Sequence, residues 1–99
     1  MFGLITNIRA TSGERARLAS ILIKASASMP GCLSYVVAAD ATDPDALWIT
    51  EVWRSAELHE ASLQLPQVRE AMRTVRPLIA GFGQRFQTSP LGGSGITAG

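Results

Sequence analysis

The stretch ALWITEVW, residues 46–53, decides the fold. Successive side chains of an extended strand point to opposite faces, so Trp48 and Val52 share one face while Ile49 and Trp53 share the other. Each face therefore carries large apolar side chains. A strand of this kind is expected to be covered on both faces of its sheet.

Three further stretches are predicted to be strands. Residues 32–39 (CLSYVVAA) are rich in β-branched and aromatic side chains, and a short polar turn joins them to the central stretch as an antiparallel hairpin. Residues 2–9 alternate with apolar groups on both sides. Residues 81–89 (GFGQRFQTS) form a weaker fourth strand, with Phe82 and Phe86 predicted on one side.

Two helical segments separate these strands. Residues 14–29 repeat apolar side chains at helical spacing and end at Pro30-Gly31. Residues 55–77 begin at a plausible N-cap, Ser55, and are interrupted by Pro66, which predicts a kink or two short helices. The resulting order, βαββαβ, is typical of a ferredoxin-like α+β fold, in which the helices cover one face of a four-stranded antiparallel sheet. This order places the first and third strands in the middle of the sheet.

Helices on one face leave the other face of the sheet open, although the central strand is apolar on both sides. The most economical cover is a second copy of the same sheet, so we expect a homodimer, with Trp48 as an interface anchor. The composition agrees, because 46% of a 99-residue chain is hydrophobic and a domain this small cannot bury all of that surface internally.

Composition also excludes several classes of protein. Nine basic and eight acidic residues give a net charge of +1, which argues against a nucleic-acid partner. No apolar stretch approaches the length of a membrane span, and the single Cys32 forms no internal disulfide. We expect a cytoplasmic protein without a metal site, with one domain over residues 1–89 and a flexible glycine-rich tail over residues 90–99.

Two polar residues of the central strands are the candidate catalytic residues. Glu51 shares its side of the strand with apolar residues, and a carboxylate in such a lining can serve as a general base. The alternative is a structural carboxylate paired with Arg9, Arg85 or a helix-start amide. Asn7 lies on the neighbouring strand, and we expect it to face the same cavity and to hold a ligand oxygen. Its alternative is a core asparagine bonded to backbone.

Three aromatic residues are candidates for binding a ligand. Trp53 shares its side with Glu51 and is the candidate aromatic wall, although plain core packing explains it equally well. His59, the single histidine, lies about 100° from the apolar stripe of its helix, which predicts a surface or rim position. Tyr35 places its hydroxyl either in the pocket or at the dimer interface, and the sequence leaves both open.

Three segments together resemble the antibiotic biosynthesis monooxygenase (ABM) family, which includes quinol monooxygenases. They are MFGLITNIRA from residue 1, MPGCLSYVVA from residue 29 and ALWITEVWRSAELHEA from residue 46. The resemblance implies a dimeric α+β barrel with a pocket between sheet and helices. It also implies oxidation of a phenol or quinol by molecular oxygen without flavin, haem or metal, in which Glu51, Asn7, Trp53 and Arg85 would supply the base, the donors and the wall.

The chain departs from the family pattern in its second helical region. Many members carry a histidine where this chain has Ser62, and often another where it has Gln67. A related branch that degrades haem has a tryptophan at the position of Ser62 and a histidine near Met72, so haem degradation is disfavoured here. His59, Ser62 and Tyr35 remain candidate substrate-binding residues. The alternative function is a dimeric module that binds a small apolar molecule without reacting with it.

Overall fold

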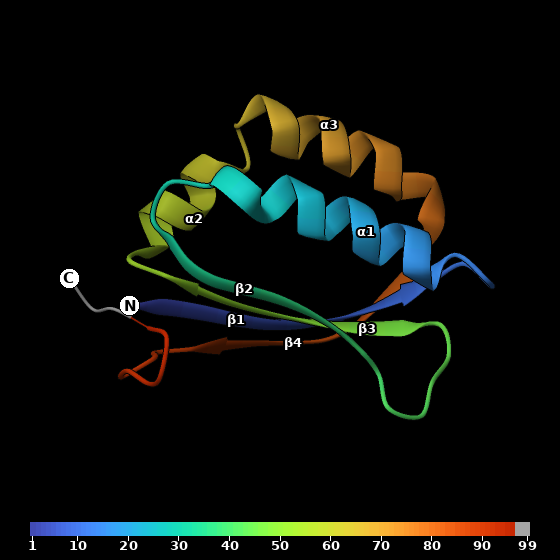
Figure 1. The fold of residues 1–99 in the computed structure, drawn as a ribbon, viewed down its shortest axis with the longest axis horizontal. Helices are drawn as coiled ribbons and strands as arrows, with labels where there is room; N and C mark the ends of the chain where they lie inside the picture. The colour runs from blue at the N-terminus through green and yellow to red at the C-terminus, as the bar shows by residue number, and fades with distance from the viewer. Residues whose placement is uncertain (97–99) are drawn as a thin grey trace.

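Four strands form one antiparallel sheet in the order β2-β3-β1-β4 in the computed structural model, which describes residues 1–96 (Figure 1). The strands are β1 (Phe2–Ala10), β2 (Cys32–Ala39), β3 (Ala46–Trp53) and β4 (Ile79–Thr88). The predicted ferredoxin-like α+β arrangement is confirmed, with the first and third strands in the middle of the sheet.

All helices lie on one side of this sheet (Figure 1). They are α1 (Arg15–Ala25), α2 (Ala56–Ser62) and α3 (Pro66–Val75), with short 3₁₀ turns at Ser26–Ser28 and Arg76–Leu78. The Ser55 side chain accepts a hydrogen bond from the backbone N–H of Leu58, as expected of an N-cap. Pro66 stands in the first turn of α3, so the interruption predicted there divides two separate helices.

The core lies between the helices and the sheet. Leu18 and Leu22 of α1 and Val75 of α3 pack against Leu47 and Ile49, which belong to one face of β3. Burial of this set follows from periodicity, because helical spacing and strand alternation each direct one apolar row inward.

Within residues 1–96, no helix or further strand covers the opposite face of the sheet (Figure 1). Register places apolar side chains from all four strands on it, and several of them are exposed or half-buried. They are Ile5, Val36, Trp48, Val52 and Phe86. Trp48 is fixed there by a 2.8 Å hydrogen bond from its indole N–H to Asp40 Oδ2.

The two aromatic side chains of the fourth strand point to opposite faces of the sheet, unlike in the sequence-based prediction. Phe82 pairs with Ile8 on the helix side of the sheet, whereas Phe86 pairs with Ile5 on the open side. The prediction that both lie on one side was wrong, because an irregularity in the β1–β4 register between Thr6 and Ile8 breaks the alternation.

Past β4, residues 90–96 contain no helix or strand. The last three residues of the predicted tail, 97–99, lie outside the described residues. No helix within residues 1–96 has both the length and the apolar character needed to cross a membrane.

Candidate active site

A cavity of about 160 Å³ lies between the sheet and the helices. Most of its wall is apolar, and its polar members come from four different elements. The apolar lining is Ile8, Leu22, Met29, Ile49, Trp53, Leu63, Val68 and Met72, and the polar lining is Thr6, Tyr35, Glu51, His59 and Ser62. A small, largely apolar hollow with a few convergent polar groups is the usual form of a small-molecule site.

Glu51 is the acidic group of this cavity. Its carboxylate accepts a 3.0 Å hydrogen bond from the indole N–H of Trp53, and it lies 4.0 Å from Nε2 of His59. The side chains of Glu51 and His59 are only 13% and 11% exposed, and Trp53 is 1% exposed. The acid is therefore held by a buried donor at one oxygen and stands beside an imidazole. The donor of that bond lies two residues away on the same strand.

His59 is buried, so the predicted surface or rim position was wrong. Its ring lies 5.4 Å from the Phe2 ring and 5.5 Å from the Trp53 ring, the latter edge-on. Phe2 and Trp53 are register neighbours on β1 and β3, and both rings pack against the flank of α2 that carries the histidine. Leu58, on the adjacent flank, is half-buried and lies close to Gly31, whereas the buried residues of this short helix are His59 and Ser62.

Tyr35 and Ser62 complete the polar lining. Tyr35 lies opposite Glu51 on β2, which resolves its two predicted positions in favour of the cavity. Burial raises the pKa of Tyr35 well above its ordinary range, and the charges of Glu51 and then Cys32 add to the effect, so its hydroxyl stays protonated as a donor. The Ser62 hydroxyl donates a 2.6 Å hydrogen bond to the carbonyl of His59.

Asn7 and Arg85 lie elsewhere. Asn7 pairs with Trp48, three places along the same strands from the Leu4–Glu51 pair. An odd separation in a strand exchanges the faces, so Asn7 lies on the open side. Its amide donates to the Leu47 carbonyl at 3.3 Å. The prediction that Asn7 and Glu51 share a cavity was wrong, because it considered strand adjacency without register. Arg85 is exposed on the edge strand and does not line the cavity.

Several lining residues were not singled out from the sequence. Thr6 was recoverable, because it alternates with Leu4 and Ile8 on β1 and so shares the inward face. Met72 belongs to the apolar stripe of α3 but gave no sign of reaching a cavity. Among residues 1–96, no cluster of three or more histidine, cysteine or acidic side chains is placed to hold a metal ion.

Comparison with known proteins agrees with this architecture. The family model for antibiotic biosynthesis monooxygenase (ABM) matches residues 1–74. The chain belongs to this family. The ABM resemblance seen in the sequence is therefore confirmed, together with the ferredoxin-like fold of a family of dimeric α+β barrels.

Solved structures extend the similarity over nearly the whole chain. A protein from Chloroflexus aurantiacus, provisionally named an antibiotic biosynthesis monooxygenase, is 56% identical, with 97% of this chain and 98% of that one covered and a TM-score of 0.94. Proteins with the same provisional name from Deinococcus radiodurans (24% identity, 98% and 99% covered, TM-score 0.76) and Nitrosomonas europaea (15% identity, 92% and 99% covered, TM-score 0.80) share the fold. No curated protein matches the chain.

Proposed function

We propose that this ABM-family protein is a monooxygenase that oxidises a small phenol or quinol with molecular oxygen in the cavity around Glu51, without flavin, haem or metal. The observation that carries the proposal is the convergence of a buried carboxylate, an imidazole and a protonated phenol on one apolar hollow. The resemblance to the ABM family supports the reaction class.

Glu51 acts as the general base in this scheme. It takes the proton from the substrate hydroxyl, while the Trp53 indole N–H keeps the carboxylate aimed into the cavity. Tyr35 and His59 stand beside the carboxylate and hold the phenolate oxygen by donating to it. The apolar wall keeps water away from the anion, which makes these contacts stronger than they are in solvent.

The phenolate then reduces oxygen. It passes one electron to O₂, and the resulting radical pair joins to form a bond between a ring carbon and oxygen. Loss of water from the peroxide leaves a quinone, so a phenol and O₂ give a quinone and H₂O. One oxygen atom enters the ring and the other leaves as water, with no external reductant.

Oxygen uptake tests the proposal. The purified protein, dialysed against a chelator, is supplied with a series of phenols and naphthols, and the quinone is followed by absorbance. Glu51→Gln preserves the acceptor for Trp53 but removes the base, so the rate is expected to fall by about 10²- to 10⁴-fold. Glu57→Gln on the exposed side of α2 is the matched control and keeps the wild-type rate.

Two results would contradict the proposal. One is an absence of oxygen uptake by the wild type with every substrate, and the other is an equal rate in Glu51→Gln. With ¹⁸O₂, the expected product carries one labelled atom per turnover.

A binding module without catalysis is the second candidate function, and the contacts of Ser62 favour it. Many family members are expected to carry a histidine at this position, so the cavity of this chain has one imidazole fewer. The Ser62 hydroxyl donates to the His59 carbonyl. A phenol that binds in the cavity and is recovered unchanged after exposure to oxygen would select this function.

We further propose that two chains associate through the open face of the sheet. The apolar side chains of that face, Val36 and Phe86 among them, are exposed in the single chain. Burial against a second sheet would remove them from water at about 25 cal/mol for each Å² of apolar surface. Sedimentation equilibrium is expected to give twice the chain mass of 10.5 kDa.

A further inference from the structure

We propose that Met72 sets the size limit of the ligand, by closing the inner cavity off from an outer groove at the edge of the molecule, where α3 faces β4. The proposal rests on the proposed function of the cavity and adds the substrate class, namely molecules with a single aromatic ring. Met72 lines both spaces: the inner cavity of about 160 Å³ and an outer groove of about 460 Å³ between α3 and β4.

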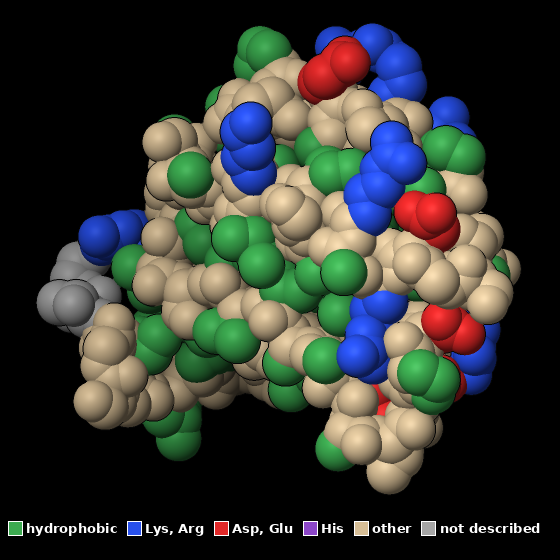
Figure 2. Space-filling view, turned by 45° about the vertical axis from the view of Figure 1, so that its right-hand side comes forward, with side chains coloured by type: hydrophobic (Ala, Val, Ile, Leu, Met, Phe, Trp, Pro, Cys, Tyr) green, Lys and Arg blue, Asp and Glu red, His purple; other side chains and the backbone are tan. Residues whose placement is uncertain are grey.

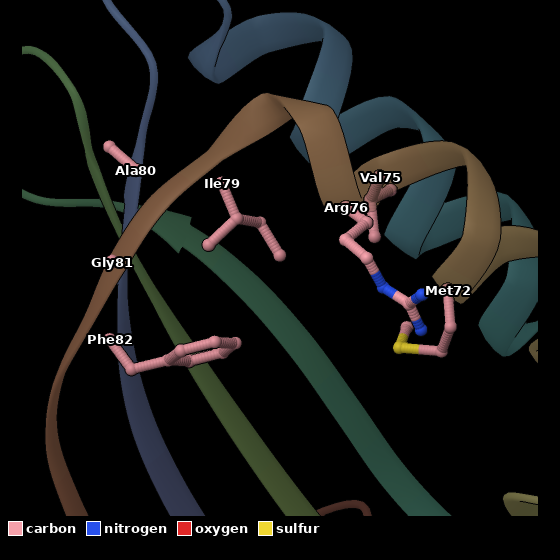
Figure 3. Close-up of a pocket in the computed structure, with 7 residues that line it drawn as sticks. All are labelled: Met72, Val75, Arg76, Ile79, Ala80, Gly81 and Phe82. Carbon is pink, nitrogen blue, oxygen red and sulfur yellow. The ribbon is translucent and has the colours of Figure 1, made fainter.

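The outer groove is formed where the edge strand leaves the helices. Met72 of α3 and Arg76 of the following 3₁₀ turn face Ile79 and Phe82 of β4 across it (Figure 3). Phe82 is 70% exposed and points to this side because the β1–β4 register shifts near Asn7. In Figure 2, hydrophobic side chains gather across the middle of the face that is turned toward the viewer.

Met72 is also placed at the way into the inner cavity. Of the residues that line that cavity, Leu63 and Met72 are the two exposed ones, at 42% and 39%, and the others are buried or half-buried. A methionine has three rotatable bonds and an unbranched chain, so it fills a gap closely and swings aside readily. Leu63 and Met72 therefore flank the way in, and Met72 is the one of the two that also lines the outer groove, so its side chain forms the wall between the two spaces.

The volume of the cavity limits what fits behind Met72. An apolar protein cavity of about 150 Å³ accommodates benzene. The inner cavity has nearly the same size, so one ring with a hydroxyl fills it, and a second or third fused ring has to pass through the position of the Met72 side chain. Beyond that position lies the groove, which has the apolar walls and the volume to take the extra rings.

Calorimetric titration with phenol and with 9-phenanthrol tests this limit in the full chain. In the wild type we expect phenol to bind more tightly than 9-phenanthrol, despite the larger apolar surface of the three-ring compound. In Met72→Ala the affinity for 9-phenanthrol is expected to rise at least tenfold, which corresponds to about 1.4 kcal/mol. Phenol, which loses part of the wall of its site, should bind no more tightly than it does to the wild type.

Val68→Ala is the matched control. It truncates a buried side chain one turn before Met72 on the same helix, and Val68 lines the inner cavity but not the outer groove. This variant enlarges the cavity on its buried side, so it is expected to leave 9-phenanthrol binding weak. An equal gain in Val68→Ala would show that volume alone is limiting and would overturn the role of Met72.

The remaining outcomes separate this inference from the proposed function. If the wild type binds 9-phenanthrol as tightly as phenol, or if Met72→Ala gains nothing, the size limit is wrong even where oxygen uptake is observed. If the binding pattern is as expected and no oxygen is consumed, the size limit stands and the oxidation proposal fails. A wild type that binds neither compound contradicts both.

Discussion

The hydrogen bond between Trp53 and Glu51 should be measurable as a coupling free energy. Trp53→Phe keeps an aromatic ring at a site that is 1% exposed but removes the indole N–H that donates to the carboxylate. A hydrogen bond to a charged group contributes about 1.5–3 kcal/mol, and one between neutral groups about 0.5–1.5 kcal/mol. In a Glu51→Gln background the same bond has a neutral acceptor. Trp53→Phe should therefore cost about 1–2 kcal/mol less there than in the wild type.

Urea unfolding of the four chains of this cycle, at one fixed protein concentration, gives that difference. For a chain of this length, 1 kcal/mol corresponds to a shift of about 4–8 °C in melting temperature, so thermal unfolding provides a second reading. Trp48→Phe is the control, because Trp48 also donates to a carboxylate but on the open face of the sheet, and its cost should not depend on Glu51. Equal costs of Trp53→Phe in both backgrounds, within about 0.5 kcal/mol, would refute the proposed contact.

Three further results are expected. Tyr35 is the single tyrosine, so absorbance titration reads it directly. The pKa of Tyr35 is expected above its ordinary value in the wild type and lower in Glu51→Gln than in the wild type. Because the unfolded chain loses this proton first, the free energy of unfolding should fall as pH rises above about 10. An ordinary tyrosine titration would contradict this. Val36→Lys should weaken the dimer by at least about 3 kcal/mol through an unpaired buried charge, whereas Ile23→Lys on the outside of α1 leaves the sedimentation mass unchanged. Gly31→Ala should destabilise the fold by about 1–3 kcal/mol in urea, because φ is +82° and an added methyl group would lie 2.5 Å from a leucine carbon of α2; wild-type stability would show that the turn relaxes.

The alternation of the strands and the residues that begin or interrupt helices were sufficient to predict the fold. Residues 46–53 alternate without interruption, so both faces of the central strand could be assigned from the sequence. Pro66 and Ser55 mark helix starts by local backbone chemistry, which tertiary contacts did not override. Glu51 and Trp53 were placed together correctly because both belong to one strand and the period of a strand is fixed.

The register between strands and the packing of helices on the sheet were less predictable from the sequence. The position of Asn7 depends on the register of β1 against β3, and a shift of one residue exchanges the two faces of a strand. Phe82 was misplaced relative to Phe86 for a similar reason, because the prediction assumed unbroken alternation through Gly83, and a glycine inside a strand often marks a bulge. The burial of His59 depends on how α2 lies across Phe2 and Trp53, a packing angle that helical periodicity does not determine.

The central claim is that a single aromatic ring binds in the inner cavity with its hydroxyl at Glu51. Crystals of the protein soaked in 4-bromophenol test it directly, because the anomalous signal of bromine locates the ring independently of the protein. The account predicts one bromine site inside the cavity, with the phenol oxygen within hydrogen-bond distance of Glu51, and loss of that site in Glu51→Leu. Bromine found only in the outer groove or on the open face of the sheet would contradict it.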